Sequence, residues 1–152
     1  MPYRTVQRLN PETAAYLAGL VDGEGSITLS AEHRGERRRI VVSISNTDRS
    51  LLEFVRECIG AGRITAKRTY SERHTPSFAY KVTNRQALDL LSQIASYLKT
   101  YRAKRAEMAI QHYVALTPRN GKYPQEVLRM RDAFEREFLA IGPGPRGRLR
   151  QP

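Results

Sequence analysis

The 152-residue sequence contains one cysteine, Cys58, and no run of apolar residues long enough to cross a membrane. A single cysteine excludes an intrachain disulfide and a cysteine-based metal cluster, so we expect Cys58 to be a buried apolar residue. The first ten residues lack the apolar core of a signal peptide. These absences predict an intracellular protein that is cytoplasmic and nucleoid-associated, or one that works in an organelle.

Acidic residues are also few: 15 Asp and Glu stand against 26 Lys and Arg, which gives a formal net charge of +11. So large an excess favours a polyanionic partner, although a merely soluble basic protein would have the same composition. Most of the basic residues are Arg, whose planar guanidinium group can bind a phosphate or a guanine edge through two parallel hydrogen bonds.

Hydrophobic periodicity, capping residues and glycines predict elements in the order α-β-β-α-β-β-α-α-α. A first helix starts at Asn10-Pro11 and is stopped by Gly23 and Gly25. The strands are expected over 26–32, 37–45, 63–70 and 77–82, and the later helices from 46 or 47 to 60, from Asn84 as cap to 98, over 102–115, and from Pro124 to 139. Two hairpins then form one antiparallel sheet covered by helices, which is an α+β fold. We expect a single domain over 1–141 and a disordered, basic Gly/Pro-rich tail over 142–152.

The second face of this sheet is polar and cationic, because the outward positions of its strands carry Arg, Lys, Ser and Thr. Such a face is commonly just solvated, but these residue types also bind base edges and phosphates in a DNA groove. The candidate DNA-binding residues are Ser26, Thr28, Ser30, Glu32, Arg34, Arg37, Arg39, Ser43, Arg63, Thr65, Lys67 and Lys81, with Ser45 on the same face. Arg39, in mid-strand, is the best candidate for reading a base.

The segment YLAGLVDGEGS, residues 16–26, joins a helix with small residues to a glycine-flanked acid. Gly19 costs roughly 1 kcal/mol relative to alanine inside a helix, and close packing against a second helix would offset that cost. At the end of the helix, the carbonyl of Gly23 and the carboxylate of Glu24 are hard oxygen ligands suited to Mg²⁺. One carboxylate is too few for a strong site, but two such helices side by side would bring two Glu24 side chains together.

From Leu17 to Gly25 this segment closely resembles the signature of the LAGLIDADG homing endonucleases. The resemblance implies the αββαββα homing-endonuclease fold, with a saddle-like antiparallel sheet and additional C-terminal helices. It also implies a site-specific endonuclease that cuts both strands of a long, roughly palindromic DNA target by metal-dependent hydrolysis during intron homing. Two alternatives stay open: an RNA maturase that binds intron RNA and assists splicing, and a DNA-binding regulator that does not cleave. An intein origin stays open as well.

The resemblance carries over several roles. The metal ligands are Glu24 and the carbonyl of Gly23, with two or more Mg²⁺ per dimer. The catalytic residues are Glu24, Asn46 and Arg102, with Arg49 as a weaker candidate and Lys99 and Lys104 as competing positions for the second cation. Asp22 is expected to be structural, through local hydrogen bonds near the helix end. The expected dimer interface consists of Leu17, Ala18, Gly19, Val21 and Asp22.

Only one copy of the motif occurs in the sequence. Two chains are then needed to supply two acids, which predicts a symmetric homodimer with an isologous interface. Such a dimer would bind a DNA target that has approximate two-fold symmetry. None of the three histidines is placed as a general base. We expect His33 and His74 to lie in loops as DNA contacts and His112 to be structural or exposed.

Overall fold

The computed structural model describes residues 5–67, 73 and 75–144, so His74, positions 68–72 and the tail from 145 onward lie outside the described residues. The elements are α1 (Pro11–Glu24), β1 (Gly25–Ser30), β2 (Arg39–Asn46), α2 (Arg49–Ile59), β3 (Arg63–Ala66), β4 (Phe78–Thr83), α3 (Asn84–Ile94), the 3₁₀ helix η1 (Ala95–Tyr97), α4 (Arg102–His112) and α5 (Gln125–Ala140). The expected α+β order is confirmed. Within these described residues no helix is both long and apolar enough to span a membrane.

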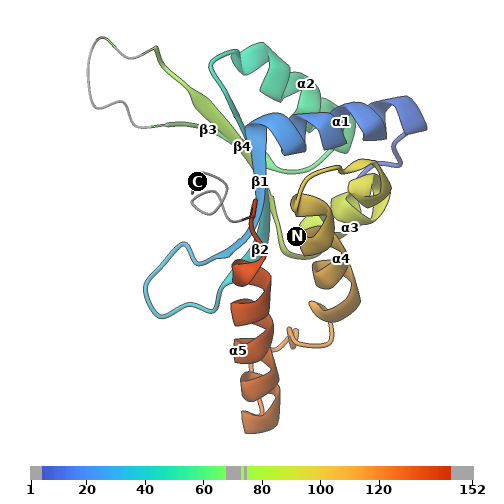
Figure 1. Ribbon diagram of the computed structural model, residues 1–152. Coiled ribbons are helices and arrows are strands. Elements are labelled where there is room, and N and C mark those ends of the chain that lie inside the picture. The colour runs from blue at the N-terminus through green and yellow to red at the C-terminus, as the bar shows by residue number, and fades with distance from the viewer. Residues whose placement is uncertain (1–4, 68–72, 74, 145–152) are drawn as a thin grey trace, which may run out of the picture.

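The four strands form one antiparallel sheet in the order β1-β2-β4-β3. The helices α1 to α4 lie on one side of the sheet, and the 31–38 loop projects toward the other, open side (Figure 1). The register pairs Ser26 with Ser43 and Ser43 with Lys81, which places small polar and basic side chains on the open face. The apolar side chains of the strands face the helices and are buried: Ile27, Leu29, Ile40, Val42, Ile44 and Val82. The alternation of the sequence therefore sets the two faces.

Helix α1 begins as expected, since the Asn10 side chain accepts a hydrogen bond from the Thr13 backbone N–H at 2.8 Å. Of the two glycines expected to stop this helix, Gly25 is its C-cap, whereas Gly23 lies inside the last turn because the helix continues to Glu24. At Gly25 a Cβ atom would collide with the Ser43 carbonyl oxygen on β2. Glycine is therefore required where the chain turns from α1 into the sheet, and this turn fixes where Glu24 lies.

Two other helix starts differ from the expectation. Asp48, not Asn46 or Thr47, caps α2, because its carboxylate accepts hydrogen bonds from the backbone N–H and the hydroxyl of Ser50. These bonds lower the pKa of Asp48 below its ordinary value. Asn84 does not cap α3; it is the first helical residue, with a φ of 56°, and no side chain caps this end. Its Oδ1 instead accepts a hydrogen bond from the Tyr113 hydroxyl.

The last helix, α5, is joined to the rest of the protomer by a fully buried arginine, Arg131. Its guanidinium group donates hydrogen bonds to the Leu116 carbonyl at 3.2 Å, to the Thr117 hydroxyl at 2.5 Å and to the Arg38 carbonyl. It also lies over the ring of Tyr113, 4.9 Å from its centroid. One side chain thus links α5, the turn after α4 and the residue that precedes β2.

We expect Arg131→Met to lower the free energy of unfolding by about 2–4 kcal/mol, because buried acceptors lose a charged donor and Glu135 loses its cation. Urea denaturation at fixed protein concentration measures the change. Arg129→Ala, at an exposed position of the same helix, should change stability by less than about 0.5 kcal/mol. Equal losses in the two variants would contradict this role of Arg131.

Candidate active site

The two expected metal ligands lie at the exposed C-terminal end of α1. Among the described residues, the Glu24 carboxylate has no hydrogen-bond or ion-pair partner, and a Cβ atom on Gly23 would have no neighbour within 4 Å. The end of a helix also presents backbone carbonyls and the negative end of the helix dipole. A free carboxylate beside such carbonyls is a partial site for a hard cation.

Asp22, the first acid of the motif, is fully engaged within its own chain. Its carboxylate accepts hydrogen bonds from the Lys99 backbone N–H at 2.7 Å and from the Thr100 hydroxyl at 2.5 Å. The expected structural role fits this geometry, but the partners come from the loop before α4, 77 residues away, and are not local. Asp22 therefore ties the end of α1 to the start of α4.

Arg102 binds the backbone of the residue that directly follows Glu24. Its Nε donates to the Gly25 carbonyl at 3.1 Å, and its Nη1 donates to the Thr100 hydroxyl at 3.3 Å. The guanidinium group also lies over the Tyr101 ring, 4.7 Å from its centroid. A pocket of about 450 Å³ opens beside these groups, lined by Asp22, Thr100, Tyr101, Arg102 and Pro143.

The other cations of this segment have different surroundings. Lys99 and Lys104 are exposed, and Arg105 donates to the carbonyls of Ile27 at 2.8 Å and Ile141 at 2.9 Å. Burial lowers the pKa of the Arg105 guanidinium. Arg105 thus fastens the end of α5 to β1, which is a structural role that the sequence pattern did not distinguish from that of Arg102.

Asn46 and Arg49 lie at the sheet end nearest Glu24, since Gly25 pairs with Ile44, two residues before Asn46. The Asn46 Oδ1 accepts a hydrogen bond from the backbone N–H of Asp48 at 2.8 Å, and its amide nitrogen has no partner among the described residues. Arg49 is paired with Glu53 at 3.1 Å along α2 and lies over the Phe78 ring. Of the two, Asn46 is the better candidate for a catalytic side chain.

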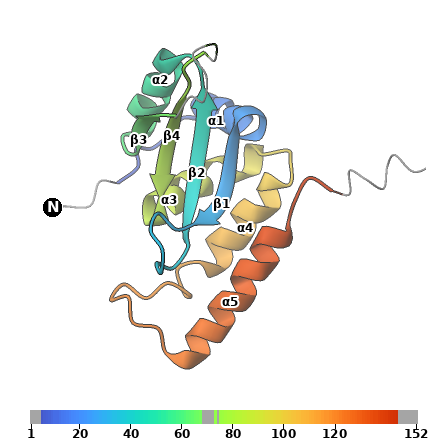
Figure 2. The same ribbon diagram turned by 90° about the vertical axis from the view of Figure 1, so that its left-hand side faces the viewer.

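On the open sheet face, shown toward the viewer in Figure 2, several of the candidate DNA contacts bind one another. Ser26 and Ser43 share a hydrogen bond of 2.8 Å. Glu32 forms ion pairs with Arg39, at 2.9 Å, and with Arg63. Desolvation acts to raise the pKa of Glu32, but the two guanidinium groups lower it below its ordinary value.

The arginine expected to read a base is therefore paired in this structure, and its side chain is 30% exposed. Arg37 is turned toward α5, where it pairs with Asp132 at 3.1 Å and lies over the Tyr123 ring. The remaining candidates on strands and loops of this face are half-buried or exposed: Thr28, Ser30, Arg34, Ser45, Thr65, Lys67 and Lys81.

Three of the expected interface residues are wrong. Leu17, Ala18 and Val21 are at most 1% exposed because they pack into the protomer's own core. A helix presents positions i, i+3, i+4 and i+7 on one face, and in α1 that face begins at Ala14 and points inward.

The opposite face of α1 is exposed and carries small residues at every fourth position: Ala15, Gly19 and Gly23. A Cβ atom on Gly19 would meet no atom within 4 Å. Tyr16, which is 49% exposed, flanks this face. In the sequence, the apolar residues at the helical spacing i, i+3, i+4 and i+7 could have been assigned to the core. Ala15 and Tyr16 would then have been identified as residues of the exposed face.

Of the three histidines, His33 and His112 belong to the described residues, and the absence of a histidine general base stays a prediction. His33 lies exposed in the 31–38 loop, and the His112 ring packs against Phe134 with their centroids 6.5 Å apart. Across the described part of the chain, no three His, Cys, Asp or Glu side chains gather as a metal site. Cys58 is half-buried, and burial raises the pKa of its thiol.

The family model described as LAGLIDADG-like domain matches residues 11–95, more than half of the chain. No curated protein sequence matches the chain.

Similar folds occur among solved structures. The homing endonuclease I-CvuI, in complex with its target in the presence of Ca, is 18% identical with a TM-score of 0.71, over 88% of this chain and 84% of that chain. The archaeal intron-encoded homing endonuclease I-Vdi141I, complexed with DNA, is 20% identical with a TM-score of 0.57, over 86% and 84%. The LAGLIDADG meganuclease I-AabMI, bound to uncleaved DNA, is 18% identical with a TM-score of 0.62, over 87% of this chain but 46% of that chain.

We expect Thr100→Val to lower the free energy of unfolding by about 1–2 kcal/mol, because the Asp22 carboxylate and Arg102 both lose the hydroxyl between them. Thr65→Val, at an exposed position of β3, is the matched control and should be nearly neutral. Urea denaturation of both variants measures the change in the free energy of unfolding. If Thr100→Val is as stable as the control, the hydroxyl does not hold the two segments together.

Proposed function

The chain belongs to the family of LAGLIDADG-like domains, and on that basis we propose that it is a site-specific endonuclease that cuts both strands of a long, roughly palindromic DNA target. The observation that carries the proposal is the carboxylate of Glu24, which has no partner among the described residues and lies at the edge of a basic sheet face, beside Arg102. A nuclease needs an acid that is free to hold a metal ion next to a surface that holds DNA.

The open sheet face is the proposed DNA-binding surface. Its two-stranded β1-β2 ribbon has the dimensions that fit a major groove. The ion pairs of Glu32 with Arg39 and Arg63 hold both guanidinium groups in place before DNA arrives. Because the groups are already ordered, less side-chain entropy is lost when they bind a base edge or a phosphate.

A homodimer is the proposed active form. One chain carries one motif and one Glu24, and it spans 84% of I-CvuI but only 46% of I-AabMI. The exposed stripe of Ala15, Gly19 and Gly23 would let the α1 helices of two protomers approach closely. Such an approach would place the two Glu24 side chains on either side of a two-fold axis.

The oxygen ligands that one protomer offers, from Glu24 and Gly23, are too few for Mg²⁺. Two or more ions per dimer fit only when both protomers and a DNA phosphate contribute oxygens. In this arrangement Glu24 and the Gly23 carbonyl would hold the ion. A bound Mg²⁺ supplies the charge that activates water and stabilises the leaving oxygen. The Arg102 guanidinium, fixed by the Gly25 carbonyl and Thr100, adds positive charge where the phosphate becomes more negative. The Asn46 amide nitrogen is free to orient a water molecule.

We expect Glu24→Gln to bind its DNA target but not to cleave it. The amide is nearly isosteric with the carboxylate and has no charge to hold the metal. Cleavage of a randomised palindromic DNA library in Mg²⁺ first identifies the target of the unchanged protein, and gel-shift binding and cleavage of the variant follow. Normal cleavage by Glu24→Gln would remove Glu24 from the site, and an unchanged protein that binds but never cuts would favour a non-cleaving regulator.

We expect Gly19→Leu to fold as a monomer and to lose double-strand cleavage. A Cβ atom on Gly19 would meet no side chain of the described residues within 4 Å, so the leucine leaves the core intact but would separate the two α1 helices. Light scattering gives the mass, and circular dichroism checks the fold. Arg136→Leu on α5, which is also exposed, controls for the added apolar surface and should stay dimeric. An active dimer of Gly19→Leu would place the interface elsewhere.

A further inference from the structure

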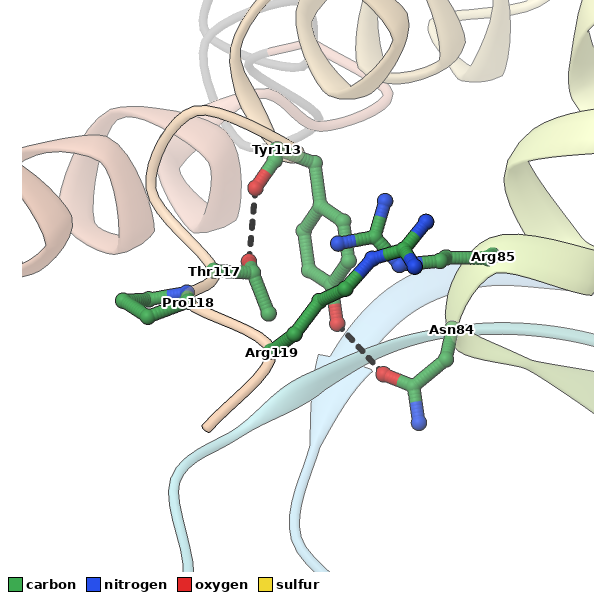
Figure 3. Close-up of a pocket in the computed structure, with 6 residues that line it drawn as sticks. All are labelled: Asn84, Arg85, Tyr113, Thr117, Pro118 and Arg119. Atoms are coloured by element: carbon green, nitrogen blue, oxygen red, sulfur yellow. Dashed lines mark hydrogen bonds between the residues drawn. The ribbon is translucent and has the colours of Figure 1, made fainter. Parts of the chain in front are cut away.

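A second basic pocket lies at the opposite end of the sheet from Glu24. Its volume is about 630 Å³, and it opens between the start of α3 and the turn that follows α4. Its lining consists of Asn84, Arg85, Tyr113, Thr117, Pro118 and Arg119. In Figure 3 the guanidinium groups of Arg85 and Arg119 extend from these two segments into the same space. We call it the Arg85–Arg119 pocket.

The walls of this pocket are fixed by hydrogen bonds that use their other polar groups. The Tyr113 hydroxyl donates to the Asn84 Oδ1 at 2.6 Å and accepts the Ile40 backbone N–H at 3.3 Å. The Thr117 hydroxyl donates to the Tyr113 carbonyl at 2.6 Å and accepts from the buried Arg131. These bonds leave unused the two guanidinium groups and the amide nitrogen of Asn84.

No acidic side chain lines the Arg85–Arg119 pocket, and neither arginine has an ion-pair partner among the described residues. Two guanidinium groups in one pocket repel each other unless an anion lies between them. Their planar forks match the oxygens of a phosphate group. The pocket volume exceeds that of a bare phosphate and suits a phosphate that is part of a nucleotide chain.

We propose that the Arg85–Arg119 pocket binds a backbone phosphate of the DNA duplex outside the stretch covered by the sheet face. The proposal rests on the proposed DNA binding of this chain. Pairing of Val41 with Thr83, and the hydrogen bond from the Ile40 backbone N–H to Tyr113, place the pocket at the start of β2, whereas Glu24 adjoins its far end. Four residues of strand separate Ile44 from Ile40, or roughly 13 Å. At 3.4 Å per base pair, a duplex that runs along β2 would pass the pocket about four base pairs outward from Glu24.

The experiment compares the unchanged protein with the double variant Arg85→Ala, Arg119→Ala on a series of target duplexes shortened from both ends. On the longest duplex, binding by the double variant should be at least about tenfold weaker, because charge-assisted hydrogen bonds are lost. The slope of log affinity against log salt should fall by about one per protomer, or about two for the dimer. On duplexes too short to reach the pocket, the two proteins should bind equally. Preferences for bases should not change.

Arg129→Ala, Arg136→Ala is the matched control, since it also removes two exposed charges but from α5, outside the pocket. A methylphosphonate that replaces one phosphate of the duplex, at successive outer positions, should weaken DNA binding by the unchanged protein at one position only. At that position it should not weaken DNA binding by the pocket variant. Titration with inorganic phosphate, at constant ionic strength, tests a free phosphate as the occupant. Saturable phosphate binding without any dependence on duplex length would overturn the DNA assignment.

Equal loss on long and short duplexes would also overturn the proposal, because the arginines would then act through general charge or folding. So would equal binding by both proteins on every duplex. Failure of the proposed function itself gives a different result, since the unchanged protein would then bind no DNA duplex specifically at any length.

Discussion

The carboxylate of Asp22 joins the end of α1 to the start of α4, through the Lys99 backbone N–H and the Thr100 hydroxyl. The other site residues depend on this contact. Thr100 accepts a hydrogen bond from the Arg102 side chain, and Arg102 in turn binds the Gly25 carbonyl at the first residue of the sheet. The first acid of the motif thus positions a cation, and the second, Glu24, is left free. A helix end, a loop and a strand are held in one arrangement by buried or half-buried polar groups, which are strong only when each is paired.

Arginine has two separate uses in this chain. Arg131 and Arg105 bind backbone carbonyls inside the protomer and attach α5 to the sheet and to the turn after α4. Others lie on the open face or at its ends, where they are exposed or are balanced by Glu32 and Asp132. The net charge of +11 therefore overstates the cationic surface that is free to bind a polyanion. Guanidinium groups suit the interior because their several donors can satisfy carbonyls that no backbone group reaches.

Local patterns predicted much of this arrangement. Alternation along β1 and β2 gave both faces of the sheet, and Asn10-Pro11 gave the start of α1. It was harder to divide the motif into core and surface residues, because its small and apolar residues lie on two faces of one helix. Ala18 belongs to the core and Gly19 to the surface. Contacts between distant segments could not be predicted, since nothing near Arg37 indicates a partner 95 residues away on α5. The choice of Arg102 over Lys99 likewise depends on which side chain points back toward α1.

The protomer completes its own core but leaves its site chemically incomplete. Its core uses the inward face of α1, and Asp22 is saturated by the loop before α4, so neither needs a second chain. Glu24 and the small-residue face are different: within the described residues neither has a partner. A single carboxylate binds a hard cation weakly. If two protomers and a DNA phosphate must supply the remaining oxygens, then hydrolysis requires both assembly and a bound target. A monomer bound to non-target DNA would then have the basic surface but not a complete catalytic site. The fold can therefore be stable in a state that has no activity.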